Sequence, residues 1–500
     1  MSRQDQIIEQ RMKKLASLKK AGIDPYPNKF DVKDKSIDLQ EKHKSLKPEK
    51  YSKETAKLAG RLMTYRDLGK ISFGTLQDSY GKIQVVLQEG ETPEKVRDFF
   101  TKYVDAGDII GVEGKIFRTK RGELSILLNK VEMLSKSILP LPDKWHGLED
   151  KEERYRKRYL DLIINSEVKE VFKKREETIT SIRKFLVNKG YIEVETPILQ
   201  PIYGGTSAKP FESKLNALNM KVYMRISNEM YLKRLIGGGY EKIFEFSRDF
   251  RNEGIDATHN PEFTLMETMC AYSDYKQNMD LVEEMLEFVA KEVTGKTKIN
   301  YQGKEIDFKR PWKRMKLIDS IKHYANLDVE KMSDKELKEK AKELKLKLPI
   351  FKRGIVIEGI FSELVENKLI QPTIIYDYPY ETCGLAKPIK DNPDYAERFE
   401  PYVNGWELGN VYSELNDPEI LEAYWKDQEK MSDKDEEAQR IDEDFLNMLR
   451  VGMPPTSGVG IGVDRLVMLL TDSTSIRDVI LFPFMKPLEL DASKNKKGGE

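Results

Sequence analysis

The strongest constraint on the fold is an alternating stretch at residues 240–272, YEKIFEFSRDFRNEGIDATHNPEFTLMETMCAY. Apolar side chains such as Phe244 and Phe246 occupy every second position of its first half, and charged or polar residues fill the positions between them. Successive side chains of a β-strand point to opposite faces, so this pattern predicts a strand. A second run follows a loop that contains Gly254 and Pro261. The stretch therefore predicts a strand, a loop and a facing strand.

The loop and the second strand carry residues that suit a nucleotide and a small cation. An arginine, carboxylates and a phenyl ring on facing strands can together hold phosphates, a cation and a base. A salt-bridged hairpin without a ligand explains the FRNE motif by itself equally well, so the rest of the chain has to decide. The residues concerned are Arg251, Glu253, His259, Asn260, Phe263, Glu267 and Met269.

Length, charge and cysteine content limit the class of protein. Five hundred residues exceed one ordinary hydrophobic core, so we expect two or three domains. Lys+Arg and Asp+Glu both number 85, so any surface that binds nucleic acid must be local. Cys270 and Cys383 provide neither a disulfide framework nor a zinc set. Apolar runs are too short to cross a bilayer and the N-terminus lacks an apolar signal core, so we expect a cytoplasmic protein without membrane association.

Residues 1–55 are interpreted as an N-terminal helix and a polar connector. Apolar residues such as Ile8 and Leu15 fall on one side of the helix, and basic residues that include Arg11 make up the rest. This pattern fits an arm that lies against RNA. A solvated amphipathic helix explains it as well, and we favour that interpretation.

Short strand-like runs separated by turn residues occupy residues 56–138, and a helical stretch at 93–104 lies between the third and the fourth run. Five strands with a helix in this place are the order of an oligonucleotide-binding (OB) barrel. Phe73 and Gln84 fall on central strands, and Glu123 opens the last one. An exposed aromatic ring beside hydrogen-bonding groups suits stacking and edge readout of a single-stranded base. A core phenylalanine with ordinary polar neighbours is the alternative.

The remaining chain divides into a linker, a second domain and a tail. The proline-containing segment 139–150 predicts a linker, and the second domain follows at 151–487. Within it, we interpret residues 314–370 as including a helical insertion with no chemistry of its own. The polar segment 488–500 predicts a disordered tail.

Three further segments of the second domain carry candidate site residues. Glu229 lies in the first turn of a predicted helix, where it either complements the helix dipole or faces an ammonium group. Asn410, Tyr412 and Glu414 share one face of a predicted strand. In GVGIGVDRLVMLLTD, closely spaced glycines leave room for a flat ligand, and Arg465 in the first turn of the following helix favours a phosphate.

Taken together, these motifs resemble the class II aminoacyl-tRNA synthetases. The strand–proline element VETP, the FRNEG…HNPEF hairpin and GIGVDRLVMLL occur in this order in that class, and the barrel narrows the resemblance to the enzymes for lysine, aspartate and asparagine. Five segments are similar to the lysyl-tRNA synthetase family in particular, and the resemblance covers residues 1–487. These segments are LPLPDKWHGLED, RYRKRYLDL, RNEGIDATHNPEFTLME, ELGNVYSELND and SIRDVILFPFMKP.

The resemblance implies an α+β chain in which an OB-fold barrel that binds the anticodon precedes a catalytic domain, an antiparallel sheet flanked by helices. It implies ATP-dependent attachment of L-lysine to tRNA(Lys) through a lysyl-adenylate, with transfer to the 3′-OH of the terminal adenosine. It also implies a homodimer formed through the helix and strand around Pro197.

The resemblance also implies roles for the candidate residues. Binding of ATP is expected from Arg251, Glu253, His259, Asn260, Phe263 and Arg465, of which Arg251 and Arg465 are the catalytic charges. Binding of lysine is expected from Gly205, Glu229, Glu267, Asn410, Tyr412 and Glu414. Mg²⁺ is expected at Glu400 and Glu407, and the anticodon at Phe73, Gln84 and Glu123. Strict alternation places Glu407 and Asn410 on opposite faces, so the metal role requires a bulge between them.

The sequence departs from the family pattern at two places. Met269 stands where the family usually has a tyrosine against the ε-amino group, and Cys383-Gly384 stands where it usually has Ser-Pro. These departures leave open a synthetase for a related amine-bearing amino acid, and a catalytically idle paralogue that binds RNA is a further alternative. An aspartyl or asparaginyl enzyme is disfavoured because Glu414 would repel an acidic substrate.

Overall fold

The computed structural model describes residues 2–142, 148, 150–346, 351–429 and 441–488. The chain divides into two compact units, Met1–Glu149 and Asp150–Glu500. Each unit has its own hydrophobic core.

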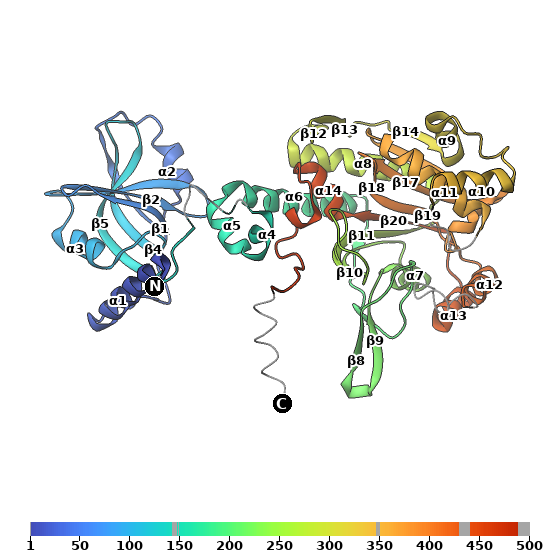
Figure 1. Ribbon diagram of the computed structural model, residues 1–500, viewed down its shortest axis with the longest axis horizontal. Helices are drawn as coiled ribbons and strands as arrows, with labels where there is room; N and C mark the ends of the chain where they lie inside the picture. The colour runs from blue at the N-terminus through green and yellow to red at the C-terminus, as the bar shows by residue number, and fades with distance from the viewer. Residues whose placement is uncertain (1, 143–147, 149, 347–350, 430–440, 489–500) are drawn as a thin grey trace. The chain divides into compact units, whose positions relative to one another are not determined.

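The first unit is a closed five-stranded barrel with the strand order β1-β2-β3-β5-β4 (Figure 1). Only the pair β3–β5 is parallel. Alternate apolar side chains such as Leu76, Val85 and Ile126 fill the barrel, and Phe100 of α3 packs against the same core. The predicted OB-type order, with a helix between the third and the fourth strand, is confirmed. Its elements are α1 (Arg3–Lys20), α2 (Ser36–Lys42), β1 (Tyr51–Asp67), β2 (Ile71–Gln77), β3 (Lys82–Gln88), α3 (Glu94–Tyr103), β4 (Ile109–Arg118) and β5 (Leu124–Ser135).

The expected connector before the barrel has more structure than the sequence suggests. Helix α2 lies within it, and the backbone N–H of Ser36 donates to Asp78 at 2.7 Å. Strand β1 begins at Tyr51, whose ring stacks on Phe117 of β4 with 5.2 Å between the centroids. These contacts join residues distant in sequence, so local composition does not show them.

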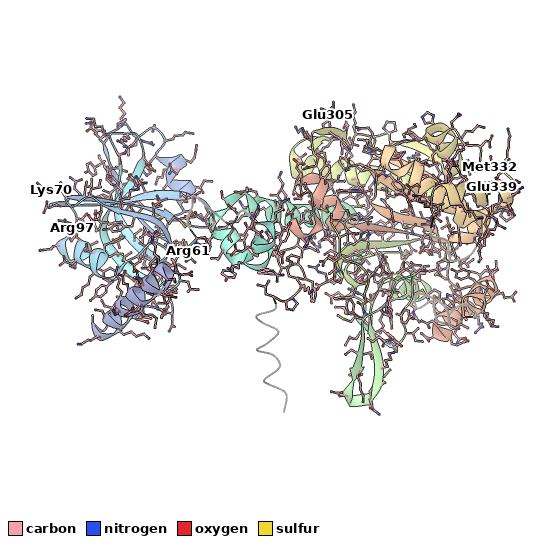
Figure 2. All side chains as sticks on the ribbon, in the orientation of Figure 1. Arg61, Lys70, Arg97, Glu305, Met332 and Glu339 are labelled. Carbon is pink, nitrogen blue, oxygen red and sulfur yellow. The ribbon has the colours of Figure 1, made fainter. Side chains whose placement is uncertain are left out.

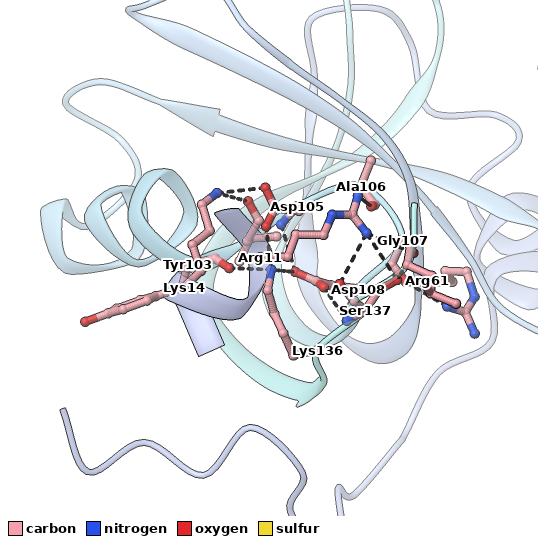
Figure 3. Close-up of polar contacts among 12 residues, drawn as sticks. Arg11, Lys14, Arg61, Tyr103, Asp105, Ala106, Gly107, Asp108, Lys136 and Ser137 are labelled. Atoms are coloured by element: carbon pink, nitrogen blue, oxygen red, sulfur yellow. Dashed lines mark hydrogen bonds and ion pairs between the residues drawn. The ribbon is translucent and has the colours of Figure 1, made fainter. Parts of the chain in front are cut away.

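Helix α1 is fixed to the barrel by a buried polar network (Figure 3). Arg11 is only 8% exposed and donates to three backbone carbonyl oxygens of the barrel unit. Lys14 pairs with Asp105 at 2.7 Å, while the fully buried Lys136 pairs with Asp105 at 2.6 Å and with Asp108 at 2.8 Å. The expected solvated basic face is therefore wrong at Arg11, because barrel carbonyls satisfy its guanidinium.

The second unit is built on a ten-stranded sheet with the main order β14-β15-β17-β19-β20-β11-β10-β6 (Figure 1). The pairs are antiparallel except β14–β15 and β6–β10. Small sheets β7-β9-β8 and β12-β13 lie outside this path. The expected antiparallel sheet flanked by helices is confirmed. Its strands are β6 (Ile192–Glu193), β7 (Leu199–Gln200), β8 (Glu212–Leu215), β9 (Met220–Met224), β10 (Lys242–Phe250), β11 (Glu262–Ala271), β12 (Lys298–Tyr301), β13 (Lys304–Asp307), β14 (Lys313–Lys316), β15 (Thr373–Pro379), β16 (Pro388–Ile389), β17 (Asn392–Val403), β18 (Trp406–Glu407), β19 (Gly409–Ser413) and β20 (Thr456–Gly462).

The central strands separate an apolar face from a polar one. Phe244 of β10, Met266 of β11 and Ile461 of β20 belong to a core shared with α6, α8 and α14. Residues of the opposite parity, such as Glu245 and Glu267, lie on the other face. That face carries the candidate site. The helices are α4 (Lys151–Arg156), α5 (Arg158–Ile164), α6 (Ser166–Asn188), α7 (Glu229–Gly237), α8 (Tyr275–Thr294), α9 (Leu317–Ala325), α10 (Asp334–Glu343), α11 (Arg353–Leu364), α12 (Pro418–Glu429), α13 (Glu443–Val451) and α14 (Val463–Leu470).

Two elements differ from expectation. The strand expected at 191–199 is reduced to the short β6 and β7, because the chain between them leaves the sheet and Thr196 donates to Glu245 at 2.7 Å. The described part of the expected insertion at 314–370 contains three α-helices and the short 3-10 helix Glu366–Lys368, but its first residues belong to β14 of the main sheet. The predicted tail lies outside the described residues apart from Leu488. Among the described residues, no helix is both long and apolar enough to cross a bilayer.

Candidate active site

The hairpin β10–β11 forms the floor of the site. Its register pairs Glu245 with Glu267 and Asp249 with Phe263, so these side chains share the polar face. The backbone N–H of Arg251, just beyond β10, donates to the carbonyl of Pro261 at 2.9 Å. The strand, loop and strand predicted for residues 240–272 are confirmed.

A cavity of about 340 Å³ lies over this face. The hairpin, the start of α7, β19, β20 and the start of α14 surround it. Met269 also lines it, whereas Glu400 does not, and Phe73, Gln84 and Glu123 belong to the barrel unit. The predicted residues at its wall are Gly205, Glu229, Arg251, Glu253, His259, Asn260, Phe263, Glu267, Glu407, Asn410, Tyr412, Glu414 and Arg465.

One end of the cavity gathers cationic and aromatic groups. The guanidinium of Arg251 lies 5.0 Å from the ring centroid of Phe263. His259 Nε2 is 3.2 Å from Arg465 Nη2, and its Nδ1 is 2.8 Å from Asp256. Because a guanidinium can only donate, these contacts assign Nε2 as the acceptor and place the ring proton on Nδ1, toward Asp256. Burial acts to raise the pKa of Asp256, but hydrogen bonds from the loop backbone and from His259 lower it to about 2, so the carboxylate is ionised and orients the ring.

The start of α14 is tied to the hairpin. Asp464 accepts a hydrogen bond from the backbone N–H of Thr264 at 2.7 Å and pairs with Arg175 of α6 at 2.6 Å. The next residue, Arg465, donates to the carbonyl oxygen of Glu407 at 2.6 Å. These contacts hold the Arg465 guanidinium at the cavity wall, at the end of the helix that favours anions.

Asn260 and Glu253 complete this end from the loop. The side-chain amide of Asn260 donates to the carbonyl of Glu262 at 2.6 Å. Its Oδ1 is buried and has no hydrogen-bond partner among the described residues. A buried acceptor without a partner at a cavity wall is available to a ligand that donates a hydrogen bond. Glu253 is exposed in the same loop.

The strand that carries Glu407 contains the expected bulge. Strand β17 pairs Tyr402 with Glu407 but Phe399 with Val411, so one extra residue lies between the two pairs on the β18–β19 side. The bulge lets Glu407 and Asn410 both reach the cavity wall, despite their opposite parity.

The two predicted metal carboxylates differ in their surroundings. Glu400 accepts hydrogen bonds from the hydroxyls of Tyr378 at 2.7 Å and Tyr402 at 2.6 Å, and its other oxygen pairs with Arg398. Desolvation and the charge of Glu400 raise the pKa of Glu407 to about 7. In the part of the chain that the structure describes, no three His, Cys, Asp or Glu side chains form a metal-ligating group. Of the two predicted metal carboxylates, Glu407 lines the cavity and Glu400 does not.

The opposite end of the cavity contains an ion-pair bridge that the sequence reasoning missed. Lys233 is 1% exposed, and its Nζ pairs with Glu229 and, at 2.5 Å, with Glu414 Oε2. The same Nζ lies 5.4 Å from the ring centroid of Tyr412. Burial lowers the pKa of Lys233, but the charges of Glu229 and Glu414 raise it above its ordinary value, so it stays an ammonium. The available clue was the spacing of Glu229 and Lys233 on one helix face.

Glu267 and Met269 lie beside this bridge. Glu267 is 9% exposed, and its Oε2 has no hydrogen-bond partner among the described residues. Burial and the neighbouring carboxylates raise the pKa of Glu267 well above its ordinary value. A Cβ atom added to Gly458 would lie 2.7 Å from both Met269 Sδ and Glu414 Oε1, so Met269 reaches the far end of the pocket. A glycine at this place on β20 leaves the space that both side chains occupy.

Arg398, a second residue that the sequence reasoning missed, links Asn410 at the cavity wall to Glu400. Its Nε donates to Asn410 Oδ1 at 3.0 Å, and its guanidinium pairs with Glu400. It also contacts Cys383 Sγ at 3.2 Å and lies 3.7 Å from Glu358 of α11. Because Arg398 takes the oxygen of the Asn410 amide, the amide nitrogen remains available to a ligand. Glu358 belongs to the expected insertion, which thus supports the site although no role was predicted for it.

Gly205 has a backbone reason to be glycine. Its φ is +95°, and an added Cβ would lie 2.9 Å from Ser227 Oγ and 3.3 Å from Glu229 Cβ. The backbone of this loop therefore passes close to Glu229 at the cavity wall.

The predicted anticodon residues lie on the outer face of the barrel. Phe73 is partly buried and lies outside the barrel core. Gln84 donates to Glu123 at 3.1 Å and accepts from Ser125 at 2.8 Å. Thr75, on the same face of β2 as Phe73, pairs with Gln84 of β3, so the ring and the amide share one surface. Lys70 and Arg97, labelled in Figure 2, lie at the end of the barrel where β1 turns into β2.

Comparison with known proteins identifies the class. Residues 150–486 match the family described as tRNA synthetases class II (D, K and N), and residues 56–134 match the OB-fold nucleic acid binding domain. The chain therefore belongs to the class II tRNA synthetases of the D, K and N group.

The most similar relatives among the curated proteins include three lysine–tRNA ligases. That of Thermoanaerobacter pseudethanolicus is 49% identical over 487 residues, 97% of this chain and 96% of the relative. The ligase of Carboxydothermus hydrogenoformans is 46% identical and covers 97% and 98%. The ligase of Moorella thermoacetica is 46% identical over 491 residues and covers 97% and 99%. The resemblance to the lysyl-tRNA synthetase family is confirmed, whereas the roles of single residues stay predictions.

Proposed function

We propose that the chain attaches L-lysine to tRNA(Lys) in two steps that consume ATP. In the first, a carboxylate oxygen of lysine attacks the α-phosphorus of ATP, and the bond to the pyrophosphate oxygen breaks. In the second, the 3′-OH of the terminal adenosine attacks the carbonyl carbon of lysyl-adenylate and loses its proton, and AMP leaves. The observation that carries the proposal is a single cavity with two arginines at one end of its wall and three buried carboxylates at the other.

The arginine end of the cavity suits ATP. Arg251 would bridge the α-phosphate and the lysine carboxylate, and Arg465 would add charge at the outer phosphates or over the base. Both stabilise the negative charge that develops on phosphorus. The attacking carboxylate is already ionised, so the first step needs positioning and no general base. Phe263 would stack on adenine, and the remaining ATP contacts are assigned to Glu253, His259 and Asn260.

The carboxylates of β17 and β18 fit a hard cation held together with phosphates. Mg²⁺ commonly uses one or two protein carboxylates and fills its other positions with water and phosphate oxygens. Glu407 lines the cavity and would be the direct ligand of the cation. Glu400 would bind the cation only through carboxylate oxygens that already accept hydrogen bonds from protein side chains. When bound, Mg²⁺ would neutralise charge on the phosphates.

The carboxylate end suits a substrate with two ammonium groups. Gly205 and Glu229 would receive the α-amino group, with Glu267 beside them, and Glu414 would pair with the ε-ammonium. Buried carboxylates also disfavour aspartate, whose own carboxylate they repel. Asn410 and Tyr412 would complete the walls.

The barrel and one exposed apolar surface account for the proposed partners. Phe73, Gln84 and Glu123 would bind the anticodon on the outer barrel face. Around Pro197, the side chains of Ile192, Ile198 and Leu199 are exposed, and we propose that a second copy of the chain covers them. Because charged tRNA is used by ribosomes, we propose that the enzyme acts in the cytoplasm.

A second candidate substrate follows from Met269. A thioether cannot make the hydrogen bond to an ε-ammonium that a phenol makes, so an amino acid with a different terminal amine is the alternative to lysine.

The test is ATP–pyrophosphate exchange with each of the twenty amino acids and with lysine analogues. We expect the strongest stimulation from lysine, loss of exchange in Arg251→Ala, and little change in Arg248→Ala. Arg248 is the matched control because it lies on the same hairpin, with its side chain half-exposed and 3.8 Å from Glu262. A stronger response to another amino acid would overturn the assignment to lysine.

A further inference from the structure

The carboxylate end of the cavity contains more negative groups than one amino acid needs. Glu229, Glu267 and Glu414 are all buried there, and each lines the cavity. Lysine brings two ammonium groups. If the three carboxylates were ionised around lysine alone, one buried negative charge would remain uncompensated, which is costly in a desolvated site.

Lys233 supplies the missing positive charge. Its Nζ lies between Glu229 and Glu414, and its side chain is 1% exposed, so it is buried directly behind these two lining carboxylates. When lysine is bound, its ammonium groups favour the ionised forms of Glu267 and Glu414. Three carboxylates then face three ammonium groups, one resident and two from the substrate. The count covers only carboxylates that line this end of the cavity. Glu245 and Asp249 lie on the same face but do not line the cavity, and both pair with Arg225, at 2.8 and 3.2 Å.

We propose that Lys233 is a resident ammonium group that sets the charge balance of the amino-acid pocket and makes the pocket specific for a substrate with two ammonium groups. The inference rests on the proposed function, since it takes lysine as the substrate. Lys233 is a positioning residue, because it contacts Glu229 and Glu414 and acts on the substrate through them. It also joins the carboxylate expected at the α-amino group to the one expected at the ε-ammonium.

This charge balance explains the placement of Lys233 on α7. Glu229 is the first residue of the helix and Lys233 lies one turn later, so a single helix face delivers both members of the pair. The helix start also brings Glu229 to within 3.3 Å, at its Cβ, of the position that a Cβ on Gly205 would take. The pocket is thus assembled from α7, β11 and the end of β19, with the resident cation at their junction.

The test is a double-mutant cycle between Lys233→Gln and Glu267→Gln, read as the KM for lysine in pyrophosphate exchange. Glu267→Gln leaves an excess positive charge in the occupied pocket, so we expect its lysine KM to rise on the order of 100-fold. Adding Lys233→Gln removes that excess charge, so we expect the lysine KM of the double variant to be roughly tenfold lower than that of Glu267→Gln alone. Lys233→Arg, which keeps the charge, gives no recovery.

A purely structural role for Lys233 predicts a different result, in which the two losses multiply and the double variant is the weakest. That outcome overturns the inference. Lys233→Met repeats the cycle with an uncharged side chain of similar length, so a folding failure of one variant does not remove the test. Melting curves and the KM for ATP identify correctly folded variants.

Arg234→Met is the matched control. Arg234 is the next residue of α7 and carries the same charge, but it pairs with Asp442, which does not line the cavity. We expect its lysine KM to stay within about twofold of the parent, as for a partly exposed ion pair away from the site. A parent chain without lysine-dependent exchange overturns the proposed function itself, whereas an active parent without recovery in the double variant overturns only the role of Lys233.

Discussion

At the scale of single residues, the cavity has an arginine end that we expect to bind the nucleotide and a carboxylate end that we expect to bind the amino acid. The structure departs from the sequence-based expectations mainly at the carboxylate end. Arg251, Phe263 and Arg465 lie at the cavity wall, as their motifs predict. At the other end, Lys233 occupies the space between Glu229 and Glu414, and Met269 stands where the family resemblance leads us to expect a tyrosine. Selectivity for the amino acid is therefore the property most open to change by substitution.

Met269→Tyr is expected to lower the KM for lysine. A phenol hydroxyl in reach of the ε-ammonium adds a hydrogen bond to a charged group, which contributes about 1.5 kcal/mol or more, roughly tenfold in affinity. The measurement is the lysine KM in pyrophosphate exchange. Met269→Phe is the control, because it adds the ring without the hydroxyl. Equal effects of Tyr and Phe would show that ring volume and not hydrogen bonding is responsible.

The KM for lysine is also expected to fall as the pH rises from 6.5 to about 8. Burial raises the pKa of Glu414 to about 8 even though the charge of Lys233 lowers it, so at lower pH this carboxyl must release a proton when the ε-ammonium of lysine binds. The lysine side chain keeps its charge in this range, since its ordinary pKa is about 10.4. A lysine KM that is flat across this range, while the KM for ATP is also flat, would contradict the ionisation assigned to Glu414.

At the scale of elements, the periodicity of apolar residues predicted the strands. The differences between the expected and the observed site arise from contacts between residues that are distant in sequence. Alternation over residues 240–272 gave both strands and the shared face of Phe263, Glu267 and Met269. The sequence could not show that Lys233 meets Glu414 or that Arg398 meets Glu358, because these partners lie on elements that only the fold brings together. The bulge before Asn410 is confirmed. It could be predicted because Glu407 and Asn410 were expected at the same site, which strict alternation does not allow.

One departure from the family pattern has a packing explanation. A Cβ on Gly384 would lie 1.9 Å from Cζ of Tyr424 of α12, so the ring occupies the space that any larger residue at 384 would need. Tyr424 packs against the same apolar cluster as Met269 and Tyr412. Gly384 and Tyr424 are therefore a matched pair next to the amino-acid pocket.

Gly384→Ala is expected to lower the free energy of unfolding by about 1–3 kcal/mol, the usual cost of overpacking. The loss should shrink in a Tyr424→Leu background, which removes the ring. Thermal or urea unfolding of the four variants measures both quantities. The same loss in both backgrounds would mean that the close approach of Tyr424 does not explain Gly384.

At the scale of the whole molecule, two units with separate cores divide the proposed work. The barrel presents Phe73 and Gln84 on its outer face, and the second unit contains the cavity with all the residues expected to act on ATP and lysine. Chain length and the order of the predicted strands indicated this division. The zero net charge gave no indication that one unit binds nucleic acid. Adenylate formation and tRNA recognition should therefore respond to different substitutions.

Phe73→Ala is expected to reduce the rate of tRNA charging roughly 5- to 150-fold at limiting tRNA, because stacking on a base contributes about 1–3 kcal/mol. Pyrophosphate exchange without tRNA should stay unchanged. Tyr80→Ala is the control, since Tyr80 is an aromatic residue that is 53% exposed on the same unit but outside the predicted surface. Equal losses in both assays would mean that Phe73 acts through the stability of the barrel.

The central claim is tested most directly by transfer of labelled lysine to purified tRNA in the presence of ATP. The account predicts that lysine becomes attached to the terminal adenosine of tRNA(Lys), that tRNA for aspartate and asparagine stays uncharged, and that Arg251→Ala abolishes the transfer. Binding of tRNA and ATP without any lysyl-tRNA, or preferential charging with another amino acid, would contradict it.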